Sequence, residues 1–222
     1  MNDLKLVIFD LAGTTVKDSG QVADAFTAAL AEHDIEITCE QLSSVRGSSK
    51  RQAVLRLIPD GPDQTRLAGL VYASFREHLI QRYGIEGVEP VDSAAAIFQW
   101  LRARGVRVAL NTGFDRDITE LLLKALHWGE AIVDALICGD EVRQGRPAPY
   151  LIFRAMEATG TTSVQQVANV GDTVLDLRAG HNAGVRWNIG VLSGAHDRQL
   201  LARMPHTHLL PSIAELRDLW PE

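Results

Sequence analysis

The chain has 222 residues, a formal net charge of −6 and 46% hydrophobic residues. This length suits one large domain, or a core domain with an insertion, and this apolar content is typical of a globular protein that buries a sizeable core. The negative charge argues against a nucleic-acid partner, and no apolar stretch approaches the length of a membrane span. We therefore expect any anionic ligand to be bound by local positive side chains.

The two cysteines, Cys39 and Cys138, lie far apart in the sequence. They indicate reduced, structural thiols and predict a cytoplasmic location. We expect no signal peptide, because Asp3 and Lys5 precede a short apolar run that ends at Asp10.

The first predicted element is a strand over the continuous apolar run of residues 6–9, which suits a strand buried on both faces of a parallel sheet. Asp10 follows at its C-terminal end, where open α/β sheets bind ligands. Gly13, Thr14 and Thr15 then form a small polar turn whose backbone N–H groups can face an anion. Taken alone, Asp10 more often caps a turn. Beside such a turn, however, a carboxylate suits a metal ligand or a nucleophile toward phosphorus.

Residues 18–87 have the pattern of a small all-helical unit. The sequence predicts one helix to about His33, a short helix from Thr38 or Cys39, a third from Lys50, and a long helix after the turn at residues 59–62 that closes at Tyr83-Gly84. The apolar face of the first helix should contain Val22, Phe26, Ala29 and Leu30. That of the third helix should contain Val54, Leu55, Leu57 and Ile58. That of the long helix should contain Leu67, Leu70, Val71, Phe75, Leu79 and Ile80.

From Val88 onward, predicted helices and strands alternate. The expected helices are 94–104, 115–127, 148–159, 175–182 and 212–219, and the expected strands are 106–110, 135–138, 167–170, 186–191 and 209–210. This alternation predicts an α/β fold with a Rossmann-like parallel sheet core covered by helices on both faces. We assign residues 1–17 and 88–222 to this core and residues 18–87 to an inserted all-helical cap domain. Such an insertion lies over the ligand-binding edge and can act as a lid.

Four polar clusters occur where strands end or helices begin. They are Asp10 with its turn, Asn111-Thr112-Gly113, Gly145-Arg146-Pro147-Ala148-Pro149, and the run from Gly171 through Asp172 to Asp176. The carboxyl ends of parallel strands converge, so these clusters should form one site. Carboxylates, a backbone carbonyl and water suit Mg²⁺, whereas an arginine and a threonine hydroxyl suit a phosphoryl or phosphonyl group.

Each cluster also has a simpler interpretation. Asp172 and Asp176 could cap the helix that begins near Val174, Thr112 could cap another, and Arg146 could lie on the surface. All four clusters occur at the expected places and in the expected order, which favours a common site.

With these motifs, the chain resembles the haloacid dehalogenase-like hydrolases over essentially its whole length. The first motif of that superfamily usually reads Asp-x-Asp-x-Thr, in which the first aspartate becomes phosphorylated and the second is the general acid and base. Here Asp10-Leu11-Ala12-Gly13-Thr14 has Ala12 in place of the second aspartate. A general acid contributes roughly 10²–10⁴ in rate, so hydrolysis of a phosphate ester would lack this help.

The same motif, continued through Thr15 and Val16, is similar to that of the phosphonatase (phosphonoacetaldehyde hydrolase) branch. So are Gly145-Arg146-Pro147-x-Pro149 and the run 171–176. In that branch a cap lysine forms a Schiff base with the substrate aldehyde, and the iminium accepts the electrons of the breaking carbon–phosphorus bond.

Lys50 has a similar placement to that lysine, although it could also contact phosphate or lie on the surface. The histidine and tyrosine of the branch are replaced here by Ala53 and Phe114. Schiff-base formation requires a neutral amine, and both burial and an inward orientation of Arg46 and Arg51 would lower the pKa of Lys50.

The resemblance implies a Mg²⁺-dependent hydrolase of a small phosphonate or phosphate that acts through an aspartyl-phosphate, with carbon–phosphorus cleavage as the first expectation. A phosphomonoester phosphatase of the same superfamily and a catalytically degenerate phosphate-binding module are the alternatives. By the same resemblance, the cap could form a homodimer. The implied metal ligands are Asp10, the Ala12 carbonyl, Asp172 and Asp176; the implied catalytic residues are Asp10, Lys50, Thr112 and Arg146; and the implied substrate contacts are Thr14, Thr15, Thr112, Gly113, Arg146 and Lys50.

Overall fold

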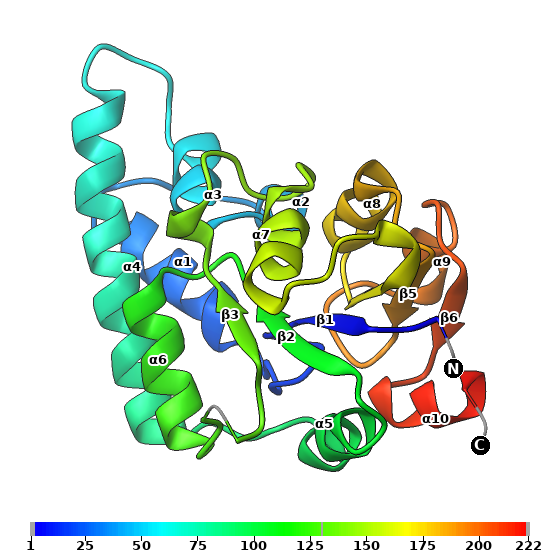
Figure 1. The fold of residues 1–222 in the computed structure, drawn as a ribbon. Helices are drawn as coiled ribbons and strands as arrows, with labels where there is room; N and C mark the ends of the chain where they lie inside the picture. Colours follow the sequence, from blue (N-terminus) through cyan, green and yellow to red (C-terminus); the bar gives the residue numbers. More distant parts are fainter. Residues whose placement is uncertain (1–2, 130, 221–222) are drawn as a thin grey trace.

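The computed structural model describes residues 3–129 and 131–220 and has a parallel sheet at its centre (Figure 1). The strand order is β3-β2-β1-β4-β5-β6, and every pairing is parallel. The strands are β1 Leu6–Asp10, β2 Arg107–Asn111, β3 Ala135–Ile137, β4 Val167–Gly171, β5 Trp187–Val191 and β6 His208–Leu210. The predicted α/β class with a Rossmann-like parallel sheet is therefore confirmed.

Helices cover both faces of this sheet. They are α5 Ala94–Arg102, α6 Arg116–Ala125, α7 Tyr150–Thr159, α8 Val174–Ala183, α9 Arg198–Leu201 and α10 Leu216–Leu219. Alternate side chains of β1 pack on opposite faces of the sheet, because successive side chains of a strand point in opposite directions. Leu6 and Ile8 join the apolar cluster that includes α7, whereas Val7 and Phe9 join the cluster that includes Phe98 of α5.

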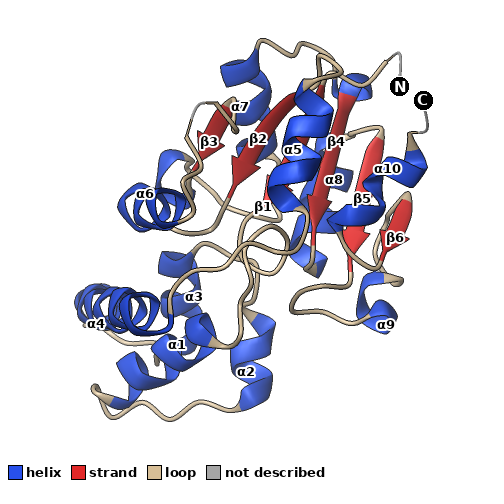
Figure 2. Cartoon of the chain, turned by 90° about the horizontal axis from the view of Figure 1, so that it is seen from below, coloured by secondary structure: helices blue, strands red, loops and turns tan. Residues whose placement is uncertain are grey.

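The inserted helices are α1 Gln21–Ala31, α2 Cys39–Ser44, α3 Lys50–Leu57 and α4 Gln64–Glu86, and we call residues 18–87 the helical segment. Figure 2 shows these helices grouped beyond the arrowheads that mark the carboxyl ends of the strands. Phe26 of α1 stacks on Phe75 of α4 with ring centroids 4.2 Å apart. Because it lies beyond the carboxyl ends of the strands, the helical segment covers the sheet edge where ligands are expected. Its boundary as a separate cap domain stays a prediction.

Two predictions for the helical segment are wrong. The long helix does not close at Tyr83-Gly84 but continues to Glu86 and ends at Gly87, whose φ of 79° is outside the helical range. A glycine inside a helix costs only about 0.5–1 kcal/mol, which the packing of this long helix tolerates. Second, three residues expected on apolar faces are exposed, at 41% for Leu55, 46% for Leu70 and 40% for Ile80. The face of α4 that contacts α1 is a narrow stripe around Val71, Phe75 and Leu79.

Most other predicted elements occur with their ends shifted by about two residues. The region 212–219 contains a 3₁₀ turn, Ile213–Glu215, followed by α10, and the four-residue α9 was not predicted because so short a helix carries no periodic signal. Cys39 and Cys138 are both free, the first exposed and the second buried. Across the residues described, no helix combines the length and apolar character needed to cross a bilayer.

The packing of α4 on α1 leads to a stability prediction. Phe75→Ala should lower the free energy of unfolding by about 3–5 kcal/mol, because it removes a fully buried ring and leaves a cavity. Ile85→Ala, at a position that is 85% exposed in the same helix, is the control and should change the value by less than about 0.5 kcal/mol. Urea unfolding followed by circular dichroism measures both, and equal values for the two variants would contradict the packing of α4 on α1.

Candidate active site

Neighbouring strand ends bring separate parts of the chain together at the carboxyl edge of the sheet. Asp10 is the last residue of β1 and is paired in register with Asn111, the last residue of β2. Asp172 directly follows β4, the other neighbour of β1. All three side chains are buried, so this edge of the sheet presents polar groups that are shielded from water.

The guanidinium of Arg146 lies between two carboxylates. Its Nη2 is 2.6 Å from Oδ1 of Asp10, and its Nη1 is 2.8 Å from Oδ1 of Asp176. Nη2 also donates hydrogen bonds to the backbone and side-chain oxygens of Asn111. Burial alone would lower the pKa of Arg146, but the neighbouring carboxylates raise it and keep the group charged. The alternative that Arg146 lies on the surface is wrong, since it is only 3% exposed.

Asp10, Asp172 and Asp176 form an acidic triad whose ligand atoms all lie within 4.8 Å of one another. Burial is the largest cause that raises the pKa of Asp172 above its usual range, and the charge of Asp10 is the next. Burial also raises the pKa of Asp176 to about 6, although Arg146 opposes this shift. Three buried carboxylates around one guanidinium leave negative charge unbalanced. The residues present therefore fit a hard divalent cation such as Mg²⁺.

Hydrogen bonds hold two of the triad's carboxylates in place. Asp172 accepts one from the Thr14 hydroxyl at 3.0 Å and one from the Ala195 N–H at 2.7 Å. Asp176 divides its two oxygens, because Oδ2 accepts from the Thr173 N–H at 3.0 Å while Oδ1 faces Arg146. The helix-capping interpretation is thus correct for one oxygen of Asp176, and the N-cap residue of α8 itself is Thr173.

The residues expected to contact substrate divide into two groups. Thr14 and Thr15 are fully buried, and their hydroxyls donate to Asp172 and to the Asp10 carbonyl respectively. Their role as substrate contacts stays a prediction. The Thr112 hydroxyl instead accepts a hydrogen bond from the Phe114 N–H at 3.1 Å, so its own proton can still be donated. Thr112 does not cap α6, because the N-cap residue of that helix is Asp115.

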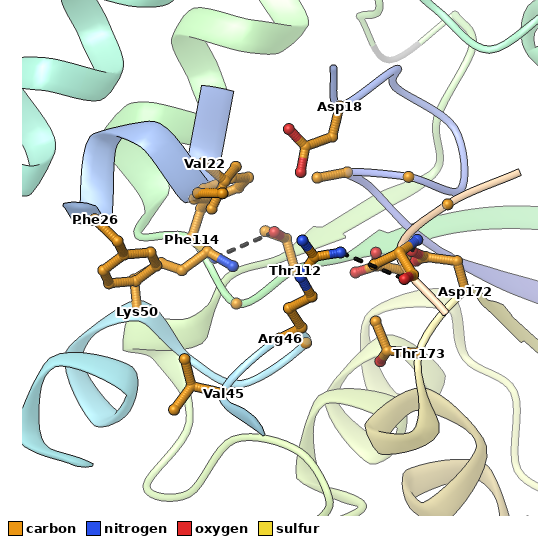
Figure 3. Close-up of a pocket in the computed structure, with 18 of the residues that line it drawn as sticks. Asp18, Val22, Phe26, Val45, Arg46, Lys50, Thr112, Phe114, Asp172 and Thr173 are labelled. Carbon is orange, nitrogen blue, oxygen red and sulfur yellow. Dashed lines mark hydrogen bonds between the residues drawn. The ribbon is translucent and has the colours of Figure 1, made fainter. Parts of the chain in front are cut away.

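A cavity of about 170 Å³ lies between the sheet edge and the helical segment. Figure 3 shows side chains from both parts around it. Of the predicted site residues, those that line it are Asp10, Ala12, Lys50, Thr112, Gly113, Arg146 and Asp172. Asp18 and Arg46 also line it; nothing in the sequence indicated Asp18, and an inward Arg46 was considered only as an influence on the pKa of Lys50. Both lie in loops, where no periodicity or strand end indicates the direction of a side chain.

The helical segment makes close backbone contact with the sheet edge at Gly113. The carbonyl of Gly113 accepts a hydrogen bond from the Lys50 N–H at 3.0 Å. A Cβ atom at Gly113 would lie 2.4 Å from the Ser48 carbonyl oxygen, so only glycine permits this approach. Lys50 is therefore anchored beside the loop that follows β2.

The Lys50 ammonium lies against an aromatic ring, with Nζ 4.6 Å from the centroid of Phe114. Burial is the largest influence on this group and lowers its pKa, while Asp10 and Asp18 oppose the shift. Of the two arginines that could lower this pKa, Arg51 pairs with Asp115 at 2.8 Å, whereas Arg46 lines the cavity. The expected lowering of the lysine pKa is present and has burial as its main cause.

Comparison with known proteins finds matches over most of the chain. A family model described as haloacid dehalogenase-like hydrolase matches residues 4–184. The chain is 30% identical over 208 residues to a Bacillus cereus protein named phosphonoacetaldehyde hydrolase, and the match covers 87% of this chain and 78% of that protein.

Solved structures show the same fold. A phosphonoacetaldehyde hydrolase-like protein from Oleispira antarctica has a TM-score of 0.85 at 20% identity and covers 98% of this chain and 91% of its own. A predicted phosphoglycolate phosphatase from Haemophilus somnus has a TM-score of 0.78 at 19% identity and covers 99% of both chains.

The acidic triad leads to a prediction about metal binding and stability. Because the pKa values of Asp172 and Asp176 are raised in the fold, their contribution to stability is present at low pH and is lost as the pH rises through these values. Mg²⁺ should offset this loss, so it should raise the Tm more at about pH 7.5 than at about pH 5.5. At a hundredfold excess over Kd, the stabilisation should be on the order of 2–3 kcal/mol.

Asp172→Asn should strongly reduce this response to Mg²⁺, because it removes one charged oxygen ligand. Asp218→Asn makes the same chemical change at an exposed position and should respond like the wild type. Thermal unfolding with Mg²⁺ and with chelator measures the effect. A Mg²⁺ response that is unchanged in Asp172→Asn would remove this residue from the metal site.

Proposed function

The chain belongs to the haloacid dehalogenase-like hydrolases, and we propose that it is a Mg²⁺-dependent member that cleaves the carbon–phosphorus bond of phosphonoacetaldehyde or a relative. The observation that carries this proposal is the combination of Ala12 beside Asp10, where an acid for ester hydrolysis would stand, with Lys50 lining the same cavity. An amine that forms an imine provides another way to stabilise the leaving group.

The acidic triad and the Ala12 carbonyl would hold Mg²⁺, which when bound would offset negative charge on the phosphonyl oxygens and the nucleophile. Arg146 and Thr112 would bind the phosphonyl oxygens through N–H and O–H donors. Arg146 also holds Oδ1 of Asp10, so the orientation of this carboxylate is restricted before substrate binds.

In the proposed reaction, the neutral Lys50 amine condenses with the substrate carbonyl to form an imine and release water. A carboxylate oxygen of Asp10 then bonds to phosphorus as the carbon–phosphorus bond breaks, and the electron pair of that bond passes to the protonated imine to give an enamine. Water hydrolyses the aspartyl-phosphate to inorganic phosphate. Protonation and hydrolysis of the enamine release the aldehyde product and restore Lys50.

The helical segment would act as a cap in this mechanism, since it supplies Lys50 while the sheet edge supplies Asp10. Burial lowers the pKa of Lys50, which favours the neutral amine that imine formation requires. A homodimer formed through this cap remains a prediction that sedimentation can test.

A phosphomonoester phosphatase is the second candidate, and the replacement of the branch's histidine and tyrosine by Ala53 and Phe114 favours it. In that case Lys50 would contact phosphate. A screen of phosphonates against phosphate esters in the presence of Mg²⁺ distinguishes these two reactions. Turnover of p-nitrophenyl phosphate, whose leaving group needs little protonation, tests the third alternative of a catalytically degenerate binding module.

The proposed nucleophile gives a prediction that holds for either reaction. Asp10→Asn should abolish phosphate release, by at least about 10³-fold, because an amide oxygen cannot form the aspartyl-phosphate. Circular dichroism should show an unchanged fold, and Asp218→Asn should keep wild-type activity. Substantial phosphate release by folded Asp10→Asn would remove this residue from the mechanism.

Lys50 separates the two reactions. Borohydride added during turnover of an aldehyde phosphonate should trap the imine as a stable adduct on Lys50, and peptide mass spectrometry locates it. Lys50→Arg keeps the charge but forms no imine, so it should lose carbon–phosphorus cleavage and still bind the anion. Either normal cleavage by Lys50→Arg, or turnover of the aldehyde without an adduct, favours the phosphomonoesterase.

A further inference from the structure

Arg46 is a positively charged side chain in the cavity that the proposed reaction does not use. It lies in the loop between α2 and α3, and its Nη1 donates a hydrogen bond to the Ala195 carbonyl at 3.3 Å. The side chain thus connects the helical segment with the loop after β5. Figure 3 shows it directed into the cavity near Thr112. Arg46 is therefore placed to contact a molecule bound beside the sheet edge.

The charge of Arg46 is not balanced by a carboxylate. Arg146 pairs with Asp10 and Asp176, and Arg51 pairs with Asp115, but no acidic side chain within the described ranges forms an ion pair with Arg46. After burial, the charge of Arg46 is the largest influence that lowers the pKa of His196. The Arg46 guanidinium therefore lies near His196 as well as Ala195.

The cavity is lined by both polar and apolar side chains. The region at the sheet edge contains Asp10 and Arg146 and suits the phosphonyl group. The lining also includes an apolar wall and the charged side chains of Asp18, Lys50 and Arg46, and Asp18 favours the charged form of Lys50. Among the described residues, Asp18 forms no ion pair with Lys50 or Arg46, so the Arg46 guanidinium can bind a second anion in this cavity. The apolar wall consists of Val22, Phe26, Leu42, Val45 and Phe114.

We propose that Arg46 binds a carboxylate on the organic part of the substrate, so that this chain acts on phosphonates that carry a second, carboxylate anion. This inference rests on the proposed function for the position of the phosphonyl group. The guanidinium has five N–H donors, and Ala195 accepts from only one of its nitrogens, Nη1. No hydrogen bond joins Nη2 or Nε to another described residue, so this edge can form a bidentate pair, which is the preferred geometry between arginine and a carboxylate.

Two small ligands test this inference directly. Methylphosphonate and phosphonoacetate share the phosphonyl group and differ by one carboxylate, and neither has the carbonyl group that an imine needs. Isothermal titration calorimetry in saturating Mg²⁺ should give a Kd about tenfold lower for phosphonoacetate than for methylphosphonate with the wild-type chain. Because no turnover is required, the measurement is independent of whether carbon–phosphorus cleavage occurs.

Variants then assign the preference to Arg46. Arg46→Gln should bring the two Kd values together while the affinity for methylphosphonate stays unchanged, and Arg46→Lys should keep part of the preference. Arg56→Gln removes the same charge from an exposed position in α3 and should keep the wild-type ratio.

The inference is overturned if wild-type protein binds both ligands equally, if neither ligand binds, or if the preference for phosphonoacetate survives Arg46→Gln. A clear preference that Arg46→Gln abolishes supports it even if Lys50 yields no borohydride adduct, which would count against the proposed function alone. The two hypotheses therefore fail through different measurements.

Discussion

The pairing of buried Arg146 with Asp10 and Asp176 is the interaction on which the rest of the site depends. A guanidinium that is removed from water requires anionic partners, and carboxylates packed this closely require a cation. Arg146 obtains its anionic partners by joining the end of β1 to the start of α8. Its single positive charge balances only one of the three carboxylates of the triad. The parallel sheet makes this possible because β1 lies between β2 and β4, so their polar ends adjoin.

The helical segment completes the cavity through backbone contacts as well as side chains. The Lys50 N–H bonds to the Gly113 carbonyl, and the Ser48 carbonyl approaches the Gly113 Cα where no side chain could fit. The apolar core continues from the sheet into this segment, where Phe26 and Phe75 belong to the same cluster as Phe9. Lys50, anchored in this way, lines the same cavity as Asp10 although the two residues are distant in sequence.

Much of this arrangement could be predicted from sequence because it depends on strand ends. The apolar run before Asp10 and the strand before Asp172 identify where each side chain emerges, and parallel pairing then brings the two together. Arg46 and Asp18 could not be recognised in the same way, because a loop residue's direction depends on tertiary contacts such as that of Arg46 with Ala195. Leu70 was misassigned for a related reason: helical periodicity indicates an apolar face but not how much of it a neighbouring helix covers.

The hydrogen bond between the Lys50 N–H and Gly113 has a consequence for how the length of this chain can vary. The position of Lys50 relative to Asp10 is set by the loop after β2, to which Lys50 is bonded, and not by the length of the inserted helices. The exposed turn at residues 59–62 lies away from this contact, so we expect added or lost residues there to leave Lys50 and Asp10 in the same relative position. One residue added between Asn111 and Asp115 would instead displace the anchor itself. Changes of chain length should therefore be tolerated in the turn at residues 59–62 and not at the contact between Lys50 and Gly113.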